Sequence, residues 1–520
     1  MMTAFMPQSY GYPLDELLTG FVSDEADLTE GYEVTGLALS SQDTSQGDLF
    51  IACRGEQHHG LEYVVDAINN GAVAIVYETP YDMKGLEQLS VYDIPMIAVS
   101  GLSSKVGYIA DRFYARPSQS MKVVGITGTN GKTSCSHFLA QLFAQNDNRV
   151  ALLGTLGNGL FGKLQPSTHT TPNAIFVQQF LARMLEQSVV DVVMEVSSHG
   201  IEQGRVNGVT FNTAVFTNLS RDHLDYHGSM ENYGRSKARL FQMPGLRYAV
   251  INADDDFGRK LLETLPDTVQ SVAYSLSDAM NADATVQRNN LMHLGCVQGS
   301  DLKYTDEGLS MHISSPWGDM ELHSQLYGRF NAENILAVLA TALINGIRIA
   351  DAVESISQLT NVAGRMERVD TAATQPLVVV DYAHTPDALQ QALQSLRMHG
   401  TGRLWCVFGC GGDRDTGKRP LMGRVADEHA DDIVLTDDNP RSEASAEILK
   451  QIKAGIKRDT NLYIESDRER AIEYALQHAR RDDVVLIAGK GHENYQLVGE
   501  QRLPFSDVNV AQRILAGGGQ

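Results

Sequence analysis

The chain has 520 residues, of which 43% are hydrophobic and 20% charged; this composition is typical of a globular protein with several domains and excludes disordered and fibrous classes. The formal net charge of −22 argues against a nucleic-acid partner. Five scattered cysteines favour a reducing compartment. Since no segment reads as a signal peptide or as a bilayer-spanning run, we expect a cytoplasmic protein without a membrane partner.

Residues 1–118 are predicted to form a small α/β domain. Strand patterns at 48–52 and 72–76 flank a helical pattern at 61–69. Pro117 lies in a segment, 115–118, that is predicted to be a linker because proline interrupts regular structure.

Residues 119–362 are predicted to form a central domain with a mainly parallel sheet. A buried-strand pattern at 121–127 is followed by a glycine-rich turn and a helical pattern at 132–144. Further strands are expected at 150–153, 190–196, 213–217 and 248–252. Strands that alternate with helices predict helices on both faces of such a sheet.

Residues 363–520 repeat this alternation and predict a second, smaller α/β domain. The expected strands are 377–380, 404–408, 433–436 and 484–488. The expected helices are 386–398, 419–429, 446–456 and 468–480.

The strongest single motif is a glycine-rich turn between a strand and a helix, the context of a phosphate-binding loop. Its candidate nucleotide contacts are Gly128, Thr129, Asn130, Gly131, Lys132, Thr133 and Ser134. Lys132 would reach the β and γ phosphates, and the Thr133 hydroxyl would bind Mg²⁺. The alternative is a glycine-rich turn without a ligand, since Ile126 stands where such loops have glycine. The motif indicates nucleotide binding but not which reaction follows.

Three further residues could take part in metal chemistry. Glu195 ends a buried-strand pattern, where an acidic residue often anchors Mg²⁺; the alternative is a solvated carboxylate. His223 lies in a His- and Asp-rich segment, 217–228, that could equally be a polar loop. Lys237, viewed alone, reads as a surface lysine on a helix.

Eight short motifs in order make the chain resemble the Mur ligase family over nearly its whole length. They are Thr-Gly-Thr-Asn-Gly-Lys-Thr at 127–133, His-Thr-Thr-Pro at 169–172, Glu-Val-Ser-Ser-His at 195–199, Asn-Leu-Ser-Arg-Asp-His-Leu-Asp at 218–225, Gly-Arg-Met-Glu at 364–367, Asp-Tyr-Ala-His-Thr-Pro at 381–386, Asp-Asn-Pro-Arg at 438–441 and Gly-Lys-Gly-His-Glu at 489–493. The resemblance implies three α/β domains: a UDP-binding N-terminal domain, a central P-loop ATPase and a C-terminal Rossmann-like domain.

The resemblance also implies the reaction, in which ATP converts a peptide carboxylate into an acyl phosphate that an amine then attacks. It makes Lys132, Glu195, His223 and Lys237 the catalytic residues. Thr133, Glu195 and His223 become Mg²⁺ ligands, together with Lys237 as a carbamylated lysine. Arg365 and His384 become further ATP contacts.

The resemblance assigns two groups of residues to a UDP-MurNAc-dipeptide. One group is His169, Thr170, Thr171, Ser197, Gln203 and Arg205, and the other is Leu39, Ser41, Glu56, Gln57 and His58. The family often has Asp-Ser-Arg where this chain has Ser40-Ser41-Gln42. For the second group, a solvated loop at 55–60 is the alternative.

The motif at 438–441 bears on the amine, because the far end of meso-diaminopimelate carries a carboxylate that lysine lacks. The fork of Arg441 would bind that carboxylate. Arg414, Asp438, Asn439, Pro440, Gly489 and Glu493 complete the implied pocket. The alternative for 438–441 is an ordinary turn, which Asn and Pro favour. The competing functions are a lysine-adding or folylpolyglutamate-type ligase, a P-loop phosphotransferase and a nonenzymatic nucleotide-binding protein. A monomer that binds only small molecules is expected.

Overall fold

The computed structural model describes residues 11–22, 31–55, 58–81, 92–146, 148–276, 293–305, 308–369, 374–399 and 401–517. Glu56 and Gln57, which were predicted to contact the UDP substrate, lie outside the described residues. The chain divides into two units: the first comprises Met1–Thr127, Asn148–Ala214 and Arg235–Arg247, and the second comprises Gly128–Asp147, Val215–Gly234 and Tyr248–Gln520.

The N-terminal part of the first unit contains a parallel sheet with strand order β3-β4-β5-β6. These strands are β3 (Gly36–Ala38), β4 (Asp48–Ala52), β5 (Ala74–Thr79) and β6 (Met96–Ser100), and the helices beside them are α1 (Leu14–Leu18), α2 (Val64–Asn69) and α3 (Leu102–Phe113), with the short elements β1 (Tyr12–Pro13), β2 (Glu33–Val34), η2 (Ser41–Asp43) and η3 (Gly60–Tyr63). Along β4, Leu49 and Ile51 join the cluster that contains α3, whereas Phe50 and Ala52 join the cluster that contains α2. Alternate side chains therefore bury both faces of the sheet.

The rest of the first unit carries the strand run β10-β9-β8-β11-β7. Its elements are β7 (Lys122–Thr127), β8 (Val150–Gly154), β9 (Gly157–Leu160), β10 (Lys163–Gln165), β11 (Asp191–Glu195), α5 (Ala174–Glu186), α6 (Ser198–Glu202), η5 (Pro117–Ser120) and η6 (Arg239–Gln242). β7 and β11 are parallel, with Glu195 opposite Ile126. Both strands therefore end at one edge of the sheet, where open α/β sheets bind their ligands. The predicted linker leads into a 3-10 turn, in which Ser118 is buried and accepts the Thr210 N–H at 3.0 Å.

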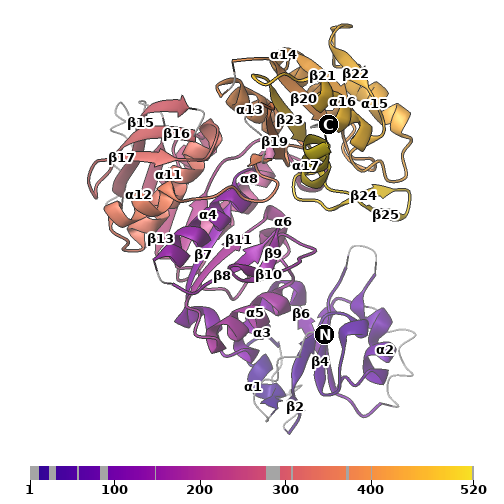
Figure 1. The fold of residues 1–520 in the computed structure, drawn as a ribbon. Helices are drawn as coiled ribbons and strands as arrows, with labels where there is room; N and C mark the ends of the chain where they lie inside the picture. The colour runs from indigo at the N-terminus through magenta and orange to yellow at the C-terminus, as the bar shows by residue number, and fades with distance from the viewer. Residues whose placement is uncertain are drawn as a thin grey trace. The chain divides into compact units, whose positions relative to one another are not determined.

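The second unit begins with the phosphate loop and the helix that follows it, and continues into a sheet of mixed direction. Its elements up to residue 357 are α4 (Lys132–Gln145), α7 (Leu224–His227), β13 (Tyr248–Asn252), α9 (Asp256–Glu263), β14 (Gln270–Ser275), β15 (His293–Thr305), β16 (Gly308–Ser314), β17 (Met320–Ser324), α11 (Arg329–Ile344) and α12 (Ile349–Ser357). Strand β12 (Thr213–Phe216) and helix α8 (Met230–Ala238) cross the division between the units. β13, β14 and β15 run parallel, and β15, β16 and β17 are antiparallel. Figure 1 shows α11 and α12 lying along these strands.

The C-terminal part of the second unit is a six-stranded sheet with order β18-β19-β23-β20-β21-β22. Its strands are β18 (Glu367–Arg368), β19 (Leu377–Asp381), β20 (Leu404–Phe408), β21 (Asp432–Leu435), β22 (Leu462–Ile464) and β23 (Val484–Ala488), its helices are α13 (Pro386–Arg397), α14 (Lys418–His429), α15 (Ser445–Lys453), α16 (Arg468–His478) and α17 (Asp507–Gly517), and a hairpin is formed by β24 (Tyr495–Val498) and β25 (Gln501–Pro504). Within the six-stranded sheet, all strands except β18 pair in parallel.

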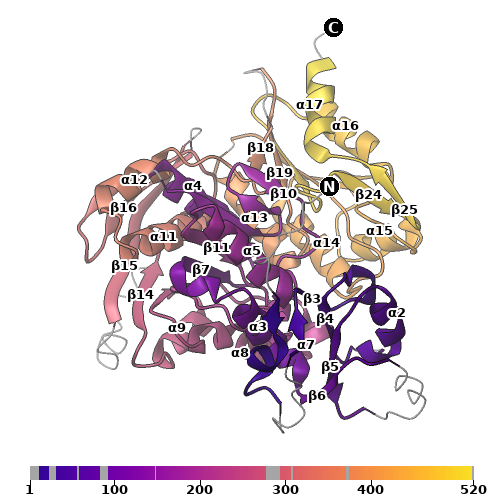
Figure 2. The same ribbon diagram turned by 90° about the horizontal axis from the view of Figure 1, so that it is seen from below.

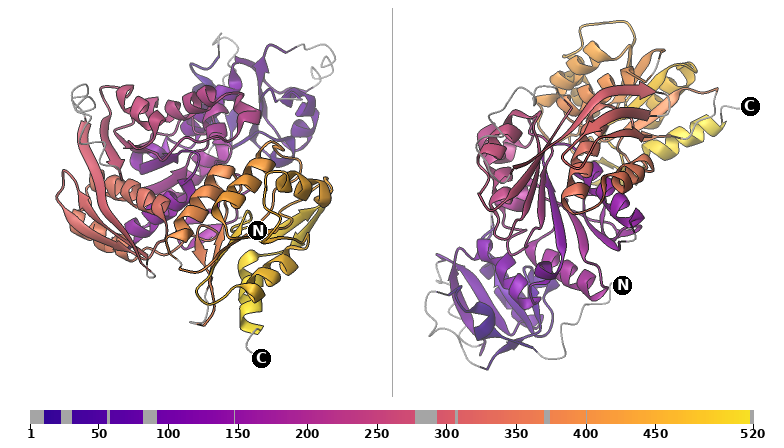
Figure 3. Two further views of the ribbon diagram at one scale, coloured as in Figure 1. Left: turned by 90° about the horizontal axis from the view of Figure 1, so that it is seen from above. Right: turned by 90° about the vertical axis from the view of Figure 1, so that its left-hand side faces the viewer.

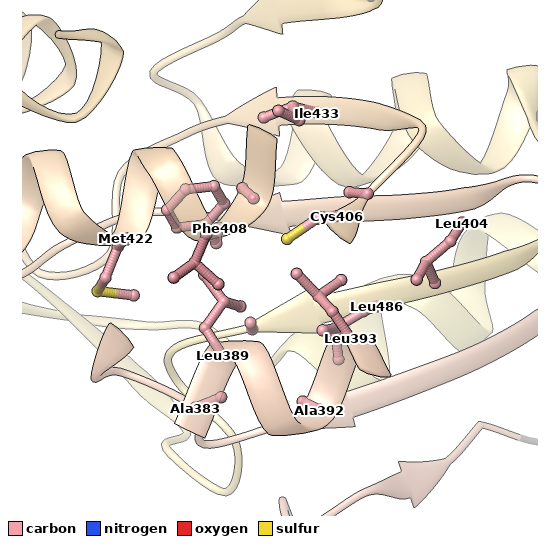
Figure 4. Close-up of a cluster of buried hydrophobic side chains, with 14 of the residues drawn as sticks. Ala383, Leu389, Ala392, Leu393, Leu404, Cys406, Phe408, Met422, Ile433 and Leu486 are labelled. Atoms are coloured by element: carbon pink, nitrogen blue, oxygen red, sulfur yellow. The ribbon is translucent and has the colours of Figure 1, made fainter. Parts of the chain in front are cut away.

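Helices cover both faces of this C-terminal sheet. Helices α13 and α14 lie side by side in Figure 3, and Figure 2 shows α16 next to α17. Between α13, α14 and the strands, Leu389, Leu393, Cys406, Phe408 and Met422 form a buried apolar cluster (Figure 4). Burial of so much apolar surface holds the strand ends, and the loops that follow them, in fixed positions.

The predicted α/β class with parallel sheets is confirmed. In the described ranges, none of the helices combines the length and the apolar character needed to cross a bilayer.

Candidate active site

The phosphate loop joins β7 to α4, and its lysine folds back over it. Lys132 Nζ donates to the carbonyl oxygens of Gly128 and Thr129, both at 2.9 Å. Thr133 and Ser134, in the first turn of α4, are buried. The helix N-terminus and the loop amides thus form an arrangement that suits phosphate binding.

Two glycines of the loop are required by close packing. Gly128 has φ +152°, and a Cβ there would overlap the Thr217 hydroxyl. Gly131 has φ +86°, and a Cβ there would lie 2.6 Å from Asn334 Oδ1. Ile126, by contrast, lies inside β7 and is buried. The strand therefore continues past position 126 in this protein, and the turn begins at Gly128.

The segment after β12 holds the phosphate loop from one side. Asn218 Oδ1 accepts the Asn130 N–H at 2.9 Å, and Thr217 Oγ1 donates to the Asn130 carbonyl at 2.6 Å. Thr129 Oγ1 is 3.2 Å from the Tyr233 hydroxyl and accepts the Ser220 N–H at 3.0 Å. These bonds fix the backbone that would surround a phosphate.

Residues from the C-terminal part of the second unit reach the same loop. Asn130 Nδ2 donates to Asp387 Oδ2 at 3.2 Å, and Arg365 Nη2 donates to Thr133 Oγ1 at 3.4 Å. The Arg365 guanidinium lies 4.5 Å from the centre of the Tyr382 ring, a cation–π contact. Two predicted nucleotide contacts, Thr133 and Arg365, are therefore adjacent.

His384 follows β19 and lies between charged groups. Its Nδ1 is 2.8 Å from the Tyr382 carbonyl oxygen, and Lys418 Nζ donates to the His384 carbonyl at 2.9 Å. Burial, and then the Lys418 charge, lower the pKa of His384. Burial alone would raise the pKa of Asp222, but the nearby His223 and His384 outweigh it and lower that pKa.

Besides Thr133, three candidates for the metal site lie in different settings. Glu195 ends β11 with 0% exposure, and its two oxygens accept the Thr155 N–H at 2.8 Å and the Thr155 hydroxyl at 3.0 Å. Lys237, in α8, is 1% exposed, which excludes the alternative of a surface lysine. The His223 side chain is 45% exposed and lies 3.4 Å from Asp222 Oδ2. Across the described ranges, no three His, Cys, Asp or Glu side chains are arranged to hold a metal ion.

Several predicted substrate contacts gather around Thr171 in the first unit. Thr171 Oγ1 donates to the Glu195 carbonyl at 2.9 Å and accepts the Ser197 N–H at 3.0 Å. Arg205 Nη1 donates to the Thr171 carbonyl at 2.7 Å, and its Nε donates to Gln203 Oε1 at 2.9 Å.

The remaining predicted substrate contacts lie on other loops of the first unit. Thr170 bonds Thr155 through the two hydroxyls at 3.0 Å, and His169 is exposed. Leu39 and Ser41 follow β3, where the Ser41 carbonyl accepts Asn70 Nδ2 at 2.8 Å. His58 is exposed beside Glu62.

The residues predicted to bind the amine come together on three loops at the carboxyl edge of the C-terminal sheet. Asn439 Nδ2 donates to Glu493 Oε2 at 2.9 Å, so the motif at 438–441 touches the motif at 489–493. A Cβ at Gly489 would lie 2.6 Å from Asp438 Oδ2. Pro440 is buried with Asp438 and Asn439.

Arg441 is held by its backbone as well as by its side chain. It has φ +50°, its N–H donates to the Leu497 carbonyl at 3.0 Å, and its carbonyl accepts the Gly499 N–H at 2.8 Å. Its Nη1 donates to the Gly412 carbonyl at 2.7 Å. Arg414 is exposed and lies nearby: a Cβ at Gly411 would be 2.8 Å from Arg441 Nη1 and 3.6 Å from Arg414 Cγ. The side chains of Arg414 and Arg441 therefore both lie next to Gly411, in the loop that follows β20.

Sequence profiles of three families match the chain in order: "Mur ligase family, catalytic domain" at residues 33–114, "Mur ligase middle domain" at 126–342 and "Mur ligase, glutamate ligase domain" at 364–491. Together they cover well over half of the chain. The chain belongs to the Mur ligase family. As a member of this family, it is a ligase that uses ATP to form an amide bond.

Full-length relatives support this assignment. A UDP-N-acetylmuramoyl-L-alanyl-D-glutamate--2,6-diaminopimelate ligase of Chromobacterium violaceum is 47% identical, over 94% of this chain and 96% of its own. The ligase of the same name from Pseudomonas aeruginosa is 45% identical, over 92% of this chain and 94% of its own. A solved structure of a ligase with that name superposes with a TM-score of 0.68 at 34% identity, covering 98% of this chain and 100% of that one.

Within this Mur ligase, three residues beside the predicted sites were not identified from the sequence. They are Thr155, which holds Glu195; Asp387, which contacts Asn130; and Lys490, which is fully buried beside Glu493. Lys490 lies inside the motif at 489–493, so the sequence could have indicated that it is close to the site. Nothing in the local sequence distinguishes Thr155 or Asp387 from surface polar residues.

Proposed function

We propose that the chain adds meso-2,6-diaminopimelate to UDP-MurNAc-L-Ala-D-Glu, with ATP converted to ADP and phosphate, in the synthesis of peptidoglycan precursors. The observation that carries the proposal is the set of full-length relatives at 45–47% identity that bear the name of this activity. The grouping of Asn439, Arg441 and Glu493 at one sheet edge supports the same substrate.

The first step takes place on the nucleotide. The D-Glu carboxylate attacks the γ-phosphorus, the bond to the β–γ bridging oxygen breaks, and ADP leaves. Negative charge accumulates in this step, so cations and oriented N–H groups must stabilise it. We assign this role to Lys132 and the amides of Gly128–Ser134, with Arg365 and His384 as further nucleotide contacts; Lys132 would exchange its two carbonyl partners for phosphate oxygens.

The second step forms the amide. The amine attacks the acyl carbon, a tetrahedral intermediate forms, and phosphate leaves as the amine loses a proton. We assign the UDP-peptide to His169, Thr170, Thr171, Ser197, Gln203 and Arg205, with Leu39, Ser41 and His58 as contacts from the N-terminal sheet.

We propose Mg²⁺ as the metal, with Thr133, Glu195, His223 and a carbamylated Lys237 as ligands. Hydroxyl and carboxylate oxygens suit this hard cation, which also takes oxygen atoms from ATP phosphates. A carbamate would turn the buried ammonium of Lys237 into an anion able to bind metal, which fits its 1% exposure. When bound, the ion would neutralise charge on the transferred phosphoryl group.

The proposed amine pocket would recognise the far end of diaminopimelate through ionic contacts. Arg441 would bind the distal carboxylate through a two-pronged hydrogen bond, and Glu493 would accept the distal ammonium. Arg414, Asp438, Pro440 and Gly489 complete the lining. Lysine lacks that carboxylate and would leave the Arg441 fork without a partner.

We further propose a cytoplasmic monomer with a UDP-binding domain at 1–118, a P-loop ligase domain at 119–362 and an amino-acid-binding domain at 363–520.

A substrate-omission assay tests the proposal. ADP release by the purified chain should need both UDP-MurNAc-L-Ala-D-Glu and diaminopimelate, and lysine should replace the latter poorly. Release without the amine would indicate a phosphotransferase, and turnover with lysine but not diaminopimelate would indicate a lysine-adding ligase.

A further inference from the structure

A fully buried lysine lies inside the proposed amine pocket. Lys490 has 0% exposure and stands between Gly489 (φ +115°) and Gly491 (φ +52°). A Cβ at Gly491 would lie 2.7 Å from the Gly364 carbonyl oxygen. The loop on both sides of Lys490 is therefore fixed by close packing, and its side chain has a defined position.

The Lys490 ammonium bonds two of the proposed amine-binding residues. Its Nζ donates to Glu493 Oε2 at 2.8 Å and to Asn439 Oδ1 at 3.1 Å. Asn439 Nδ2 donates to the same Glu493 oxygen at 2.9 Å, and the Leu497 N–H donates to Asn439 Oδ1 at 2.9 Å. The Tyr495 ring centre lies 5.6 Å from Nζ.

This network defines how both partners are presented. Since Asn439 Oδ1 accepts two hydrogen bonds, its amide cannot turn over without losing them. Both side-chain donors that the structure describes for the Glu493 carboxylate bond Oε2. A buried ammonium is tolerated only when it is paired in this way, and the pair in turn fixes the carboxylate.

We propose that Lys490 is a positioning residue that determines which amine the pocket accepts, by neutralising Glu493 and fixing its orientation. The inference rests on the proposed function and deepens it. Lys490 offsets the charge of Glu493, to which it is bonded, while Arg414 and Arg441 lie beside the neighbouring loop at Gly411. A pocket with charges of both signs suits a ligand end that carries both an ammonium and a carboxylate, as in diaminopimelate.

Loss of the Lys490 charge would change this balance. Glu493 would then lose the cation bonded to it and would attract a ligand ammonium more strongly, which favours a ligand end with an ammonium alone. The change should act on the choice between two amines and not on the shared nucleotide steps. This separates a positioning role from a general loss of structure.

The test compares kcat/KM for diaminopimelate and for lysine in the full-length Lys490→Gln protein. Glutamine keeps a hydrogen-bond donor but removes the charge. We expect the ratio of the two kcat/KM values to fall about tenfold, mainly through a higher KM for diaminopimelate. A folded variant whose ratio stays within about twofold of the parent overturns the inference.

Arg458→Gln is the matched control. Arg458 Nε bonds Asp427 Oδ1 at 2.6 Å, and its Nη1 donates to the Asp431 carbonyl at the opposite end of β21 from Asp438. This variant removes a paired cation from the connection between α15 and β22 and should lower both kcat/KM values equally, if at all. A comparable fall in the ratio for Arg458→Gln would mean that the change in amine preference is not specific to Lys490.

The Glu493→Gln background shows whether Lys490 acts through Glu493. When Lys490→Gln is added to it, both charges of the pair are absent. The ratio of the two kcat/KM values should then differ by less than about threefold from the ratio in Glu493→Gln itself. A larger change overturns the inference, and this comparison also serves if Lys490→Gln does not fold. If the parent protein prefers lysine, the proposed function is refuted. If the parent protein prefers diaminopimelate and Lys490→Gln has the same ratio as the parent, only the inference is refuted.

Discussion

Thr155 holds both carboxylate oxygens of Glu195. Its N–H donates to Oε1 at 2.8 Å and its hydroxyl donates to Oε2 at 3.0 Å. Gly154 precedes it, and a Cβ there would overlap Glu195 Oε1. The end of β8 thus orients the acidic side chain at the end of β11, and a carboxylate that is already oriented loses less entropy when it binds a metal ion.

Replacement of Thr155 by valine should weaken the response to Mg²⁺. The variant keeps the N–H but loses the hydroxyl, so one Glu195 oxygen is no longer held. We expect the Mg²⁺ concentration for half-maximal activity to rise about tenfold or more, measured by ADP release during metal titration. Thr264→Val, which removes a hydroxyl bonded at the end of α9, is the control. An unchanged Mg²⁺ titration would refute a role for Thr155 in orienting a ligand.

Replacement of Lys237 by alanine should strongly reduce turnover. Without the amine no carbamate can form, so the proposed anionic ligand is lost; kcat should fall at least about 100-fold. Addition of a small carboxylate such as acetate or formate should restore part of the rate. Full activity of the variant would remove the carbamate from the account.

Replacement of Arg441 by alanine should remove the preference for diaminopimelate. The lost two-pronged bond to the distal carboxylate should cost about 2 to 3 kcal/mol in kcat/KM for that amine, while kcat/KM for lysine changes little. Competition between the two amines measures the ratio. A preference that survives the substitution would mean that another group reads the carboxylate.

Removal of one partner from the buried pair of Arg468 and Asp507 should strongly destabilise the C-terminal sheet. Both side chains are 0% exposed. Arg468 also donates to the carbonyl of Asp437, which lies after β21, and to the carbonyl of Ala488, which is the last residue of β23. Arg468→Met leaves a carboxylate buried alone and should lower the free energy of unfolding by about 3 to 5 kcal/mol.

The double variant Arg468→Met/Asp507→Leu is the matched comparison for that pair. It should recover part of the loss in urea unfolding because no charge is left unpaired. If the double variant is less stable than Arg468→Met, the lost stability does not come from an isolated charge.

Acid should destabilise the protein through two histidines. Burial, and then the Arg365 guanidinium, lower the pKa of His137 and of His492 to about 4. In the unfolded chain these side chains take up protons near pH 6.5, so the unfolded state binds more protons between about pH 6.5 and 4. Stability should therefore fall as the pH drops through that window, by about 2 kcal/mol for each histidine.

Urea unfolding at several pH values measures this contribution. His137→Gln/His492→Gln should show a shallower loss between pH 6.5 and 4 and no change in pH dependence above pH 7. If the free energy of unfolding falls equally in the parent and in the double variant, the acid sensitivity comes from carboxylates instead.

Segments with strong local patterns could be predicted from the sequence. The strand expected at 248–252 and those at 404–408 and 484–488 match β13, β20 and β23 residue for residue. They consist mainly of apolar residues between turns, and such runs bury on both faces of a parallel sheet. Helix α4 was expected because the glycine-rich turn indicates where a helix must begin.

The antiparallel strands β15, β16 and β17 were not predicted. β15 carries polar residues such as Gln298, Ser300 and Lys303, so its strand character depends on pairing with β16 and not on its own hydrophobic pattern. The burial of Lys490, Arg468 and Asp507 was not predicted, for a related reason. Lysine, arginine and aspartate are usually exposed, and their burial here depends on partners from other segments of the chain.

The most direct test of the central claim is the mass of the product formed when ATP, UDP-MurNAc-L-Ala-D-Glu and equal concentrations of diaminopimelate and lysine are supplied together. The account predicts a product that carries diaminopimelate, formed in step with ADP. A product that carries lysine, or ADP formed without any amide product, would contradict it.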